Sequence, residues 1–322
     1  MILILTSSAD TNADYVIAWL KQYNYPYFRL NADAILDGRF YISPLENKLY
    51  LDGQEIDLSK VNAVWLYKFG GFHKTGYFHK NKAHITQDSV GQLSSEFSAI
   101  LISVMSMLSD KKWLTRPSTS QVNKIDILRK VAAFDIDVPP AYIVSEKQIL
   151  YDLLQKEGSL ISKSIYEPFF IKKPNGYYSM FTRQLDKENI DKLPSTFFPS
   201  LVQRKIDKKY EIRCFYLDGE FYSMAIFSQK NKSTKLDFRR YDWANPNRKV
   251  PYQLPKELAS KLRKMLENLN MNCCSLDILK SSEDNKYYFL EINPTGQFGM
   301  VSQPCNYDLY NKIAQKLIQM DS

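Results

Sequence analysis

The first third of the chain repeats one pattern, a short apolar run followed by an amphipathic segment. Met1–Thr6 is an apolar run typical of a buried parallel strand, and the residues SSAD after it can cap a helix. Tyr27–Leu30 and Val61–Tyr67 predict the next strands, and Gln87–Ser109 predicts a long helix. Strands that alternate with helices in this way favour an open α/β sheet for residues 1–116.

The pattern changes after Pro117. Ser118–Phe134 predicts a helix with Lys124 near its middle, and from about residue 158 strands and hairpins rich in Tyr and Phe follow. Asp218-Gly219 lies between two apolar runs and is the strongest hairpin signal, because this pair supplies the positive φ angles of a type I′ turn. The fold class is therefore α/β, with an α+β C-terminal half.

Composition excludes several classes of protein. The 322 residues are 44% hydrophobic, which is enough apolar material for a core and excludes a disordered chain. The four cysteines form no CxxC pair, which favours a reducing compartment. The longest apolar stretch, Ala99–Leu108, is shorter than the about 20 residues of a membrane span, and no basic segment precedes the N-terminal apolar run. We therefore expect a soluble, cytoplasmic protein with no membrane partner.

The charge and the loops narrow the choice of ligand. The net charge is +8, which favours anionic partners: phosphates, carboxylates, acidic peptides or nucleic acid. Gly70–Phe78 has glycines near Walker spacing, but Tyr77 and Phe78 stand where Lys and Ser/Thr are required, and no GxGxxG follows the first strand. Any phosphate must therefore be held by lysine, arginine and metal rather than by a glycine-rich loop.

The C-terminal strand pair carries a candidate metal site. Asp277 lies within the apolar run LDILK, and Glu291 and Asn293 in FLEINPTG are two residues apart, so one face of a strand holds both. If the two strands pair antiparallel, three oxygen ligands converge, and oxygen ligands are what Mg²⁺ prefers. The alternative is that these are ordinary surface carboxylates on a two-faced strand.

Basic residues upstream form a second candidate cluster. Lys163 and Lys172 follow apolar runs in two predicted strands, where a lysine either reaches solvent or faces an anion. Glu211 and Arg213 are two residues apart and share a face. They form either a plain ion pair or a ribose acceptor beside a phosphate clamp.

The order of these features resembles the ATP-grasp superfamily. Lys124, Lys163, the LVQRKI strand, EIR, LDI and EINPTG follow one another as they do there. The opening MILILTSSAD, the FRLNAD segment and VWLYKFGGF are similar to ATP-grasp maturases of ribosomal peptides, that is, graspetide synthetases of the microviridin type and above all the grasp-with-spasm group. The resemblance implies an N-terminal Rossmann-like pre-ATP-grasp domain, a central subdomain and a C-terminal ATP-grasp subdomain with the metal site, at residues 1–116, 117–200 and 201–322.

The resemblance also implies roles for residues at the ATP site. Lys124 and Lys163 would contact the phosphates of ATP. The main chain of Arg204 and Ile206 would form the hinge that binds adenine, with Gln203 beside it. Glu211 would bind the ribose. Lys172 stays an alternative to Lys163, because the phosphate-covering loop near Asn175–Ser179 holds a single glycine.

Further implied roles concern the reacting groups. Arg213 would steady the transferred phosphoryl group, and Arg239 or Arg240 would meet the substrate carboxylate. The residues implied to hold two Mg²⁺ ions are Asp277, Glu291 and Asn293.

The implied activity is that of an ATP-dependent peptide macrocyclase. The γ-phosphate of ATP would be transferred to an Asp or Glu carboxylate of a ribosomal precursor peptide, giving an acyl phosphate. A Ser/Thr hydroxyl or Lys amine of that peptide would then attack and form an ω-ester or ω-amide. The precursor would carry an acidic core and a leader that docks near Lys230–Arg240, and the enzyme would be a homodimer. The runner-up is a glutathione-synthetase-like ligase for free amino acids or small peptides. A nucleic-acid-binding module with aromatic stacking platforms is the alternative of another class, although no recognisable nucleic-acid motif is present.

Overall fold

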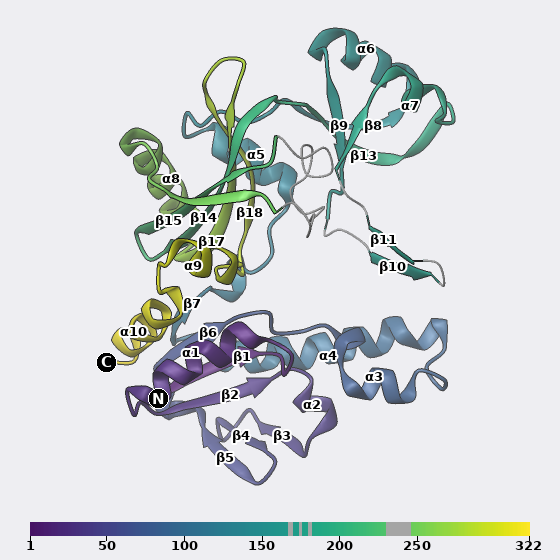
Figure 1. The fold of residues 1–322 in the computed structure, drawn as a ribbon. Helices are drawn as coiled ribbons and strands as arrows, with labels where there is room; N and C mark the ends of the chain where they lie inside the picture. The colour runs from purple at the N-terminus through teal and green to yellow at the C-terminus, as the bar shows by residue number, and fades with distance from the viewer. Residues whose placement is uncertain (167–169, 174–175, 180–181, 230–245) are drawn as a thin grey trace. The chain divides into compact units, whose positions relative to one another are not determined.

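The computed structural model describes residues 1–166, 170–173, 176–179, 182–229 and 246–322. Its residues divide into two compact units (Figure 1). Unit 1 consists of Met1–Gln121, Met271–Cys273 and Phe298–Ser322, and unit 2 consists of Val122–Asn270 and Cys274–Gln297. The three-domain division at residues 116 and 200 stays a prediction.

Unit 1 is built on a parallel sheet in the order β2-β1-β6-β7. Its strands are β1 (Ile2–Thr6), β2 (Tyr27–Asn31), β6 (Ala63–Leu66) and β7 (Lys112–Leu114). Every residue of β1 and β6 is buried, as expected when helices cover both faces of a parallel sheet. The predicted α/β character of the first part of the chain is confirmed.

Helices complete this unit. The Asp10 side chain caps α1 (Thr11–Gln22) by accepting from the Ala13 N–H at 3.0 Å, and Thr86 caps α4 (Gln87–Ser106). α1 packs against α10 (Leu309–Asp321), which also contacts β6. The shorter elements of unit 1 are α2 (Ala34–Asp37), α3 (Gly76–Asn81), α9 (Gly299–Cys305), the 3₁₀ turns Leu58–Lys60, Phe72–Lys74 and Pro117–Thr119, and the antiparallel sheet of β3 (Phe40–Ser43), β4 (Lys48–Leu51) and β5 (Gln54–Asp57).

Unit 2 begins with α5 (Lys124–Ala132) and an antiparallel sheet in the order β12-β9-β13-β8. The members of this sheet are β8 (Ala141–Glu146), β9 (Leu160–Lys163), β12 (Arg183–Leu185) and β13 (Thr196–Arg204). α6 (Lys147–Glu157) and α7 (Lys187–Asp191) pack on one of its faces, where Val144, Leu160 and Val202 lie in a common core (Figure 1). β10 (Phe170–Lys173) and β11 (Gly176–Ser179) form a separate hairpin.

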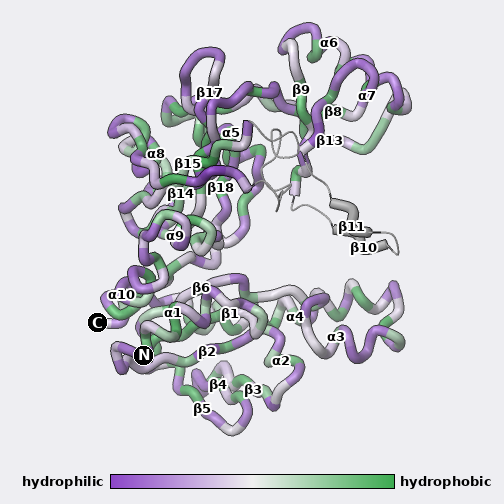
Figure 2. The backbone as a smooth tube through the Cα atoms, viewed as in Figure 1, coloured by the Kyte–Doolittle hydropathy of each residue, from purple (hydrophilic) through white to green (hydrophobic). Residues whose placement is uncertain are grey.

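A five-stranded sheet in the order β16-β15-β14-β17-β18 forms the rest of unit 2. Its strands and the accompanying helix are β14 (Lys208–Leu217), β15 (Glu220–Phe227), β16 (Arg248–Tyr252), β17 (Cys273–Ser281), β18 (Tyr287–Asn293) and α8 (Lys256–Asn268). Hydrophobic residues concentrate in β14 and β15 (Figure 2). The predicted turn is confirmed: Asp218 and Gly219 have φ angles of 43° and 102°, and Leu217 pairs with Glu220.

Two sequence expectations are tested by local structure. The helix predicted over Ser118–Phe134 is wrong at its start, because the Asn123 side chain accepts from the Ile125 and Asp126 N–H groups and caps α5 there. None of the four cysteines forms a disulfide bond, and all four are buried. Within the described part of the chain, no helix has the length and apolarity needed to cross a bilayer.

Candidate functional site

The pairing of β17 with β18 brings the predicted oxygen ligands together. The strands are antiparallel, with Asp277 opposite Glu291 and Ser275 opposite Asn293. Because side chains alternate along a strand, Asp277, Glu291 and Asn293 lie on one face of the sheet. The convergence expected from the sequence is therefore present in the structure.

A β-bulge adds an apolar cluster to the same face. The register shifts between Asp277 and Ile278, so Leu290 has no partner and Tyr288 pairs with Leu279. Leu279 lies two residues from Asp277, so Tyr288 and Glu291 share a face although they are three residues apart. The bulge thus places the acids beside apolar side chains.

Arg213 on β14 binds Asp277 on the neighbouring β17. Its Nη1 lies 2.5 Å from both carboxylate oxygens, and its side chain is 5% exposed. The buried Nε of Arg213 has no hydrogen-bond partner among the described residues. The guanidinium therefore holds one carboxylate and keeps a donor for another anion.

Burial raises the pKa of Asp277 to about 6; the Arg213 guanidinium opposes this shift and the Glu291 carboxylate adds to it. Negative charge at this place is thus only partly compensated by the protein. Two carboxylates and the Asn293 amide oxygen form a donor set that suits Mg²⁺, which also keeps water and phosphate ligands. The residues present therefore fit a magnesium ion.

Lys124 approaches these acids from the first turn of α5. Its Nζ lies 3.8 Å from Glu291 Oε2 and donates to the carbonyl oxygens of Ser164 and Tyr166, at 3.4 and 3.0 Å. The lysine connects β18 with the segment that follows β9. An ammonium group in this position can bind a phosphate beside the acids.

Lys163 and Gln203 lie on the face of the β12-β9-β13-β8 sheet that α6 does not cover. Lys163 pairs with Leu201 and Ile161 with Gln203, whereas Val202 packs toward α6. The Gln203 side chain is buried, and Lys163 is half-buried. The side chain of Lys172, and all of Arg239 and Arg240, lie outside the residues that the structure describes.

The segment between β13 and β14 is the predicted hinge. The N–H groups of Arg204 and Lys205 donate to the carbonyls of Pro140 and Ser159, each at 2.9 Å. The Ile206 N–H makes no hydrogen bond with any described residue. Ile206 is buried against Leu279 and Tyr288, with Leu290 packed on the same cluster. This residue combines a main-chain donor with an apolar surface, as recognition of a purine base requires.

Glu211, on the same face of β14 as Arg213, has partners that the sequence did not reveal. The Lys208 ammonium pairs with Glu211 Oε1, and Ser228 Oγ donates to that oxygen at 3.1 Å. Lys208 is three residues from Glu211, so strict strand alternation would place the two on opposite faces. Ser228 lies beyond a hairpin and left no signal in the pattern.

No protein-family model and no curated protein sequence matches the chain. Solved structures do. A RiPP-associated ATP-grasp ligase from Chryseobacterium gregarium, in complex with ADP and a leader and core peptide, matches with a TM-score of 0.84 at 20% identity, over 99% of this chain and 96% of that one. The chain has the ATP-grasp fold. This ATP-grasp chain also matches macrocyclase MdnC from Microcystis aeruginosa, bound to precursor peptide MdnA, with a TM-score of 0.79 at 21% identity over 99% of both chains.

A third ATP-grasp structure is similar to this chain over nearly its full length. The ligase PsnB, complexed with minimal precursor, Mg and ADP, has a TM-score of 0.78 at 15% identity, over 100% of this chain and 97% of its own. The structural similarity to these three proteins shows the ATP-grasp fold, and the predicted fold class is confirmed.

Proposed function

We propose that this protein is an ATP-dependent peptide macrocyclase that forms side-chain ω-ester or ω-amide bonds in a ribosomally made precursor peptide. The observation that carries the proposal is the single sheet face that holds Arg213, Asp277, Glu291 and Asn293, with Lys124 at its edge. The similar structures bound to precursor peptides, and in two cases to ADP, support the choice of substrate.

In the proposed site, ATP lies between the two sheets of unit 2. The Ile206 N–H and its apolar neighbours receive the adenine, Glu211 accepts from the ribose hydroxyls, and Lys163 and Lys124 bind the phosphates. Two Mg²⁺ ions, held by Asp277, Glu291 and Asn293, would supply the positive charge that lets a carboxylate approach a triphosphate.

The first chemical step transfers the γ-phosphoryl group to a side-chain carboxylate of the peptide, giving an acyl phosphate and ADP. The Arg213 guanidinium stabilises the charge that develops on the transferred group. A Ser/Thr hydroxyl or Lys amine of the same peptide then attacks the acyl carbon; inorganic phosphate leaves, and the nucleophile loses its proton. Arg239 or Arg240 orients the substrate carboxylate. No protein nucleophile is required.

The partners follow from the same proposal. The precursor contributes an acidic core, which suits the net charge of +8, and a leader that docks near Lys230–Arg240. A homodimer and a cytoplasmic location stay predictions from the sequence.

The test is mass spectrometry of a precursor peptide encoded beside the gene, incubated with this protein and Mg·ATP. We expect ATP-dependent loss of one water mass per ring, release of ADP, and capture of the acyl phosphate by hydroxylamine. Brief alkaline treatment opens an ester ring and leaves an amide ring intact. The Glu291→Gln variant should have the same thermal unfolding midpoint as the wild type and should form no ring.

Each alternative has its own outcome in this experiment. Phosphate release with free amino acids and no peptide would replace the proposal by the amino-acid ligase. Salt-sensitive binding of arbitrary oligonucleotides without Mg·ATP binding would replace it by a nucleic-acid-binding module. Wild-type ring formation by Glu291→Gln would refute the metal assignment.

A further inference from the structure

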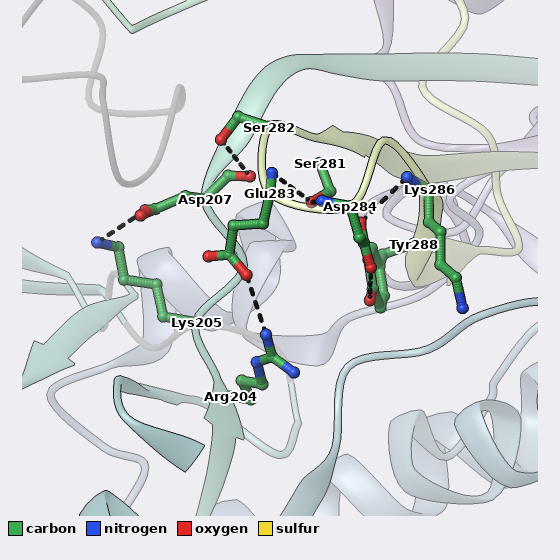
Figure 3. Close-up of polar contacts among 9 residues, drawn as sticks. All are labelled: Arg204, Lys205, Asp207, Ser281, Ser282, Glu283, Asp284, Lys286 and Tyr288. Atoms are coloured by element: carbon green, nitrogen blue, oxygen red, sulfur yellow. Dashed lines mark hydrogen bonds and ion pairs between the residues drawn. The ribbon is translucent and has the colours of Figure 1, made fainter.

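The turn between β17 and β18 binds the carbonyl group of Asp207, the residue that follows Ile206. The Ser282 hydroxyl donates to the Asp207 carbonyl oxygen at 3.0 Å (Figure 3). The Ser282 N–H donates to the same oxygen at 2.8 Å. Two donors on one carbonyl fix the orientation of the peptide group between Asp207 and Lys208, which closes the segment that contains Ile206, more strongly than one would. This contact joins residues 75 positions apart in the sequence.

The same turn also binds the residue two positions before Ile206. Glu283 Oε2 lies 2.9 Å from Arg204 Nη2, and these side chains are 43% and 36% exposed (Figure 3). Lys205 in turn pairs with Asp207 at 3.0 Å. The segment from Arg204 to Asp207 is therefore held at both of its ends by one turn.

The turn is itself rigidly built. The buried Ser281 hydroxyl accepts from the Glu283 N–H at 3.1 Å, and the Ser281 N–H donates to the Lys286 carbonyl at 2.9 Å. Asp284 accepts from the Lys286 N–H at 3.1 Å and from the Tyr288 hydroxyl at 2.7 Å. The Tyr288 hydrogen bond lowers the pKa of Asp284 to about 2, so this acceptor is ionised at neutral pH.

Tyr288 contacts both the turn and the hinge residue Ile206. Its ring packs in the buried cluster with Ile206 and Leu279, while its hydroxyl anchors the turn. Ile206 thus lies between two residues that the turn holds by polar contacts, Arg204 and Asp207, and its side chain packs against Tyr288. We propose that the turn Ser281–Lys286 is a positioning element for the nucleotide base, in which Ser282 and Glu283 hold the Ile206 N–H in the orientation that binds a purine nitrogen. This proposal rests on the function proposed above.

A positioning role predicts a loss confined to the base. The double variant Ser282→Ala/Glu283→Gln removes one of the two donors to Asp207 and the charge that holds Arg204. We expect the KM for ATP to rise about fivefold to tenfold while kcat at saturating ATP changes less than about twofold. Inhibition by inorganic tripolyphosphate with Mg²⁺, which has no base, should be unchanged.

Controls separate this role from a general loss of structure. The single variant Ser282→Thr keeps the hydroxyl and leaves Glu283 intact, so its KM for ATP should equal that of the wild type. Glu188→Gln breaks the exposed ion pair with Lys192 on α7, at 2.6 Å, and should leave the KM unchanged. The thermal midpoint of each nucleotide-free variant verifies that it is folded.

The outcomes are distinguishable. Equal ATP affinity of the double variant and the wild type would overturn the positioning role alone, as would equal weakening of ATP and tripolyphosphate. A wild-type protein that fails to bind Mg·ATP would overturn the proposed function together with it.

Discussion

Arg213 Nη1 lies 2.5 Å from both carboxylate oxygens of Asp277, and this pair joins β14 to β17 on the face that carries the candidate site. Both side chains are largely buried, so neither charge is solvated freely. Removing either partner would leave the other as an uncompensated buried charge. The pair therefore serves the geometry of the site and its electrostatics together.

The first prediction concerns Arg213→Lys. Lysine keeps the charge but lacks the fork of donors and the Nε–H, so the proposed mechanism loses its stabilisation of the transferred phosphoryl group. We expect the rate of ADP release at saturating substrates to fall about 100-fold or more, with ATP affinity changed only a few-fold. Stopped-assay kinetics measure both quantities.

Arg263→Lys is the matched control for this variant. Arg263 donates from Nε to the Gly219 carbonyl at 3.0 Å and lies over the Phe221 ring, so its role is structural. Its replacement should leave turnover unchanged. A similar loss of turnover in both variants would contradict the role given to Arg213.

The second prediction concerns Lys124→Gln. This change removes the ammonium near Glu291 and its donation to the carbonyls of Ser164 and Tyr166. We expect the dissociation constant for Mg·ATP, measured by calorimetry, to rise about tenfold, which is equivalent to roughly 1.4 kcal/mol. Lys130→Gln on the same helix breaks only the pair with Asp126 and should bind ATP normally; equal weakening in both would remove Lys124 from the phosphate site.

The third prediction is a pH dependence of stability. The pKa of Asp284 is lowered from its ordinary 3.8 to about 2, chiefly by the Tyr288 hydroxyl. A carboxylate with a depressed folded-state pKa stabilises the fold above the unfolded-state value and loses this effect as the pH falls through the folded-state value. The wild type should therefore be more stable than Asp284→Asn at pH 5.

The stability difference between these two proteins should shrink progressively between pH 3.8 and about 2. Urea unfolding of both proteins at several pH values measures it. A difference that stays constant over this range would mean that Asp284 acts by packing alone.

The fourth prediction concerns Gly296, which follows β18, the strand with the proposed metal ligands Glu291 and Asn293. Its φ is +61°, and a Cβ there would lie 2.9 Å from Phe215 Cε2, so Gly296→Ala is opposed by both backbone and packing. We expect a loss of about 2–4 kcal/mol in the free energy of unfolding. Gly158→Ala has a φ of +75° with nothing within 4 Å, so it reports the backbone cost alone. Equal losses in the two variants would show that Phe215 moves aside freely.

Strand alternation was sufficient to place part of the site. Glu291 and Asn293 share a face because they are two residues apart, and a short turn between the strands predicts the antiparallel pairing that brings Asp277 opposite. The Asp218-Gly219 turn was equally local, because the required φ angles belong to those residue types. Such features depend on near neighbours in the chain and can be found without a structure.

Other contacts lay beyond the reach of pattern analysis. Arg204 and Glu283 are 79 positions apart, so only the folded chain reveals their pairing. Lys208 pairs with Glu211 against the alternation, since it is the first residue of β14 and its long side chain can turn back. The start of α5 differs from the prediction because the Asn123 side chain caps the helix at that point, and such a side-chain contact with the main chain leaves no trace in the apolar periodicity.

The unpaired Leu290 restricts how β18 can change in length. Substitution at this position keeps the residue count, so the acids and Tyr288 continue to point the same way. Deleting Leu290 would leave Tyr288 opposite Leu279 and two residues from Glu291, so both would still share a face, now in a regular strand. Inserting a residue here would require a second unpaired residue to keep Tyr288 opposite Leu279. Related chains that keep both halves of this surface should therefore tolerate replacement or loss of the residue at position 290, but not an additional residue beside it.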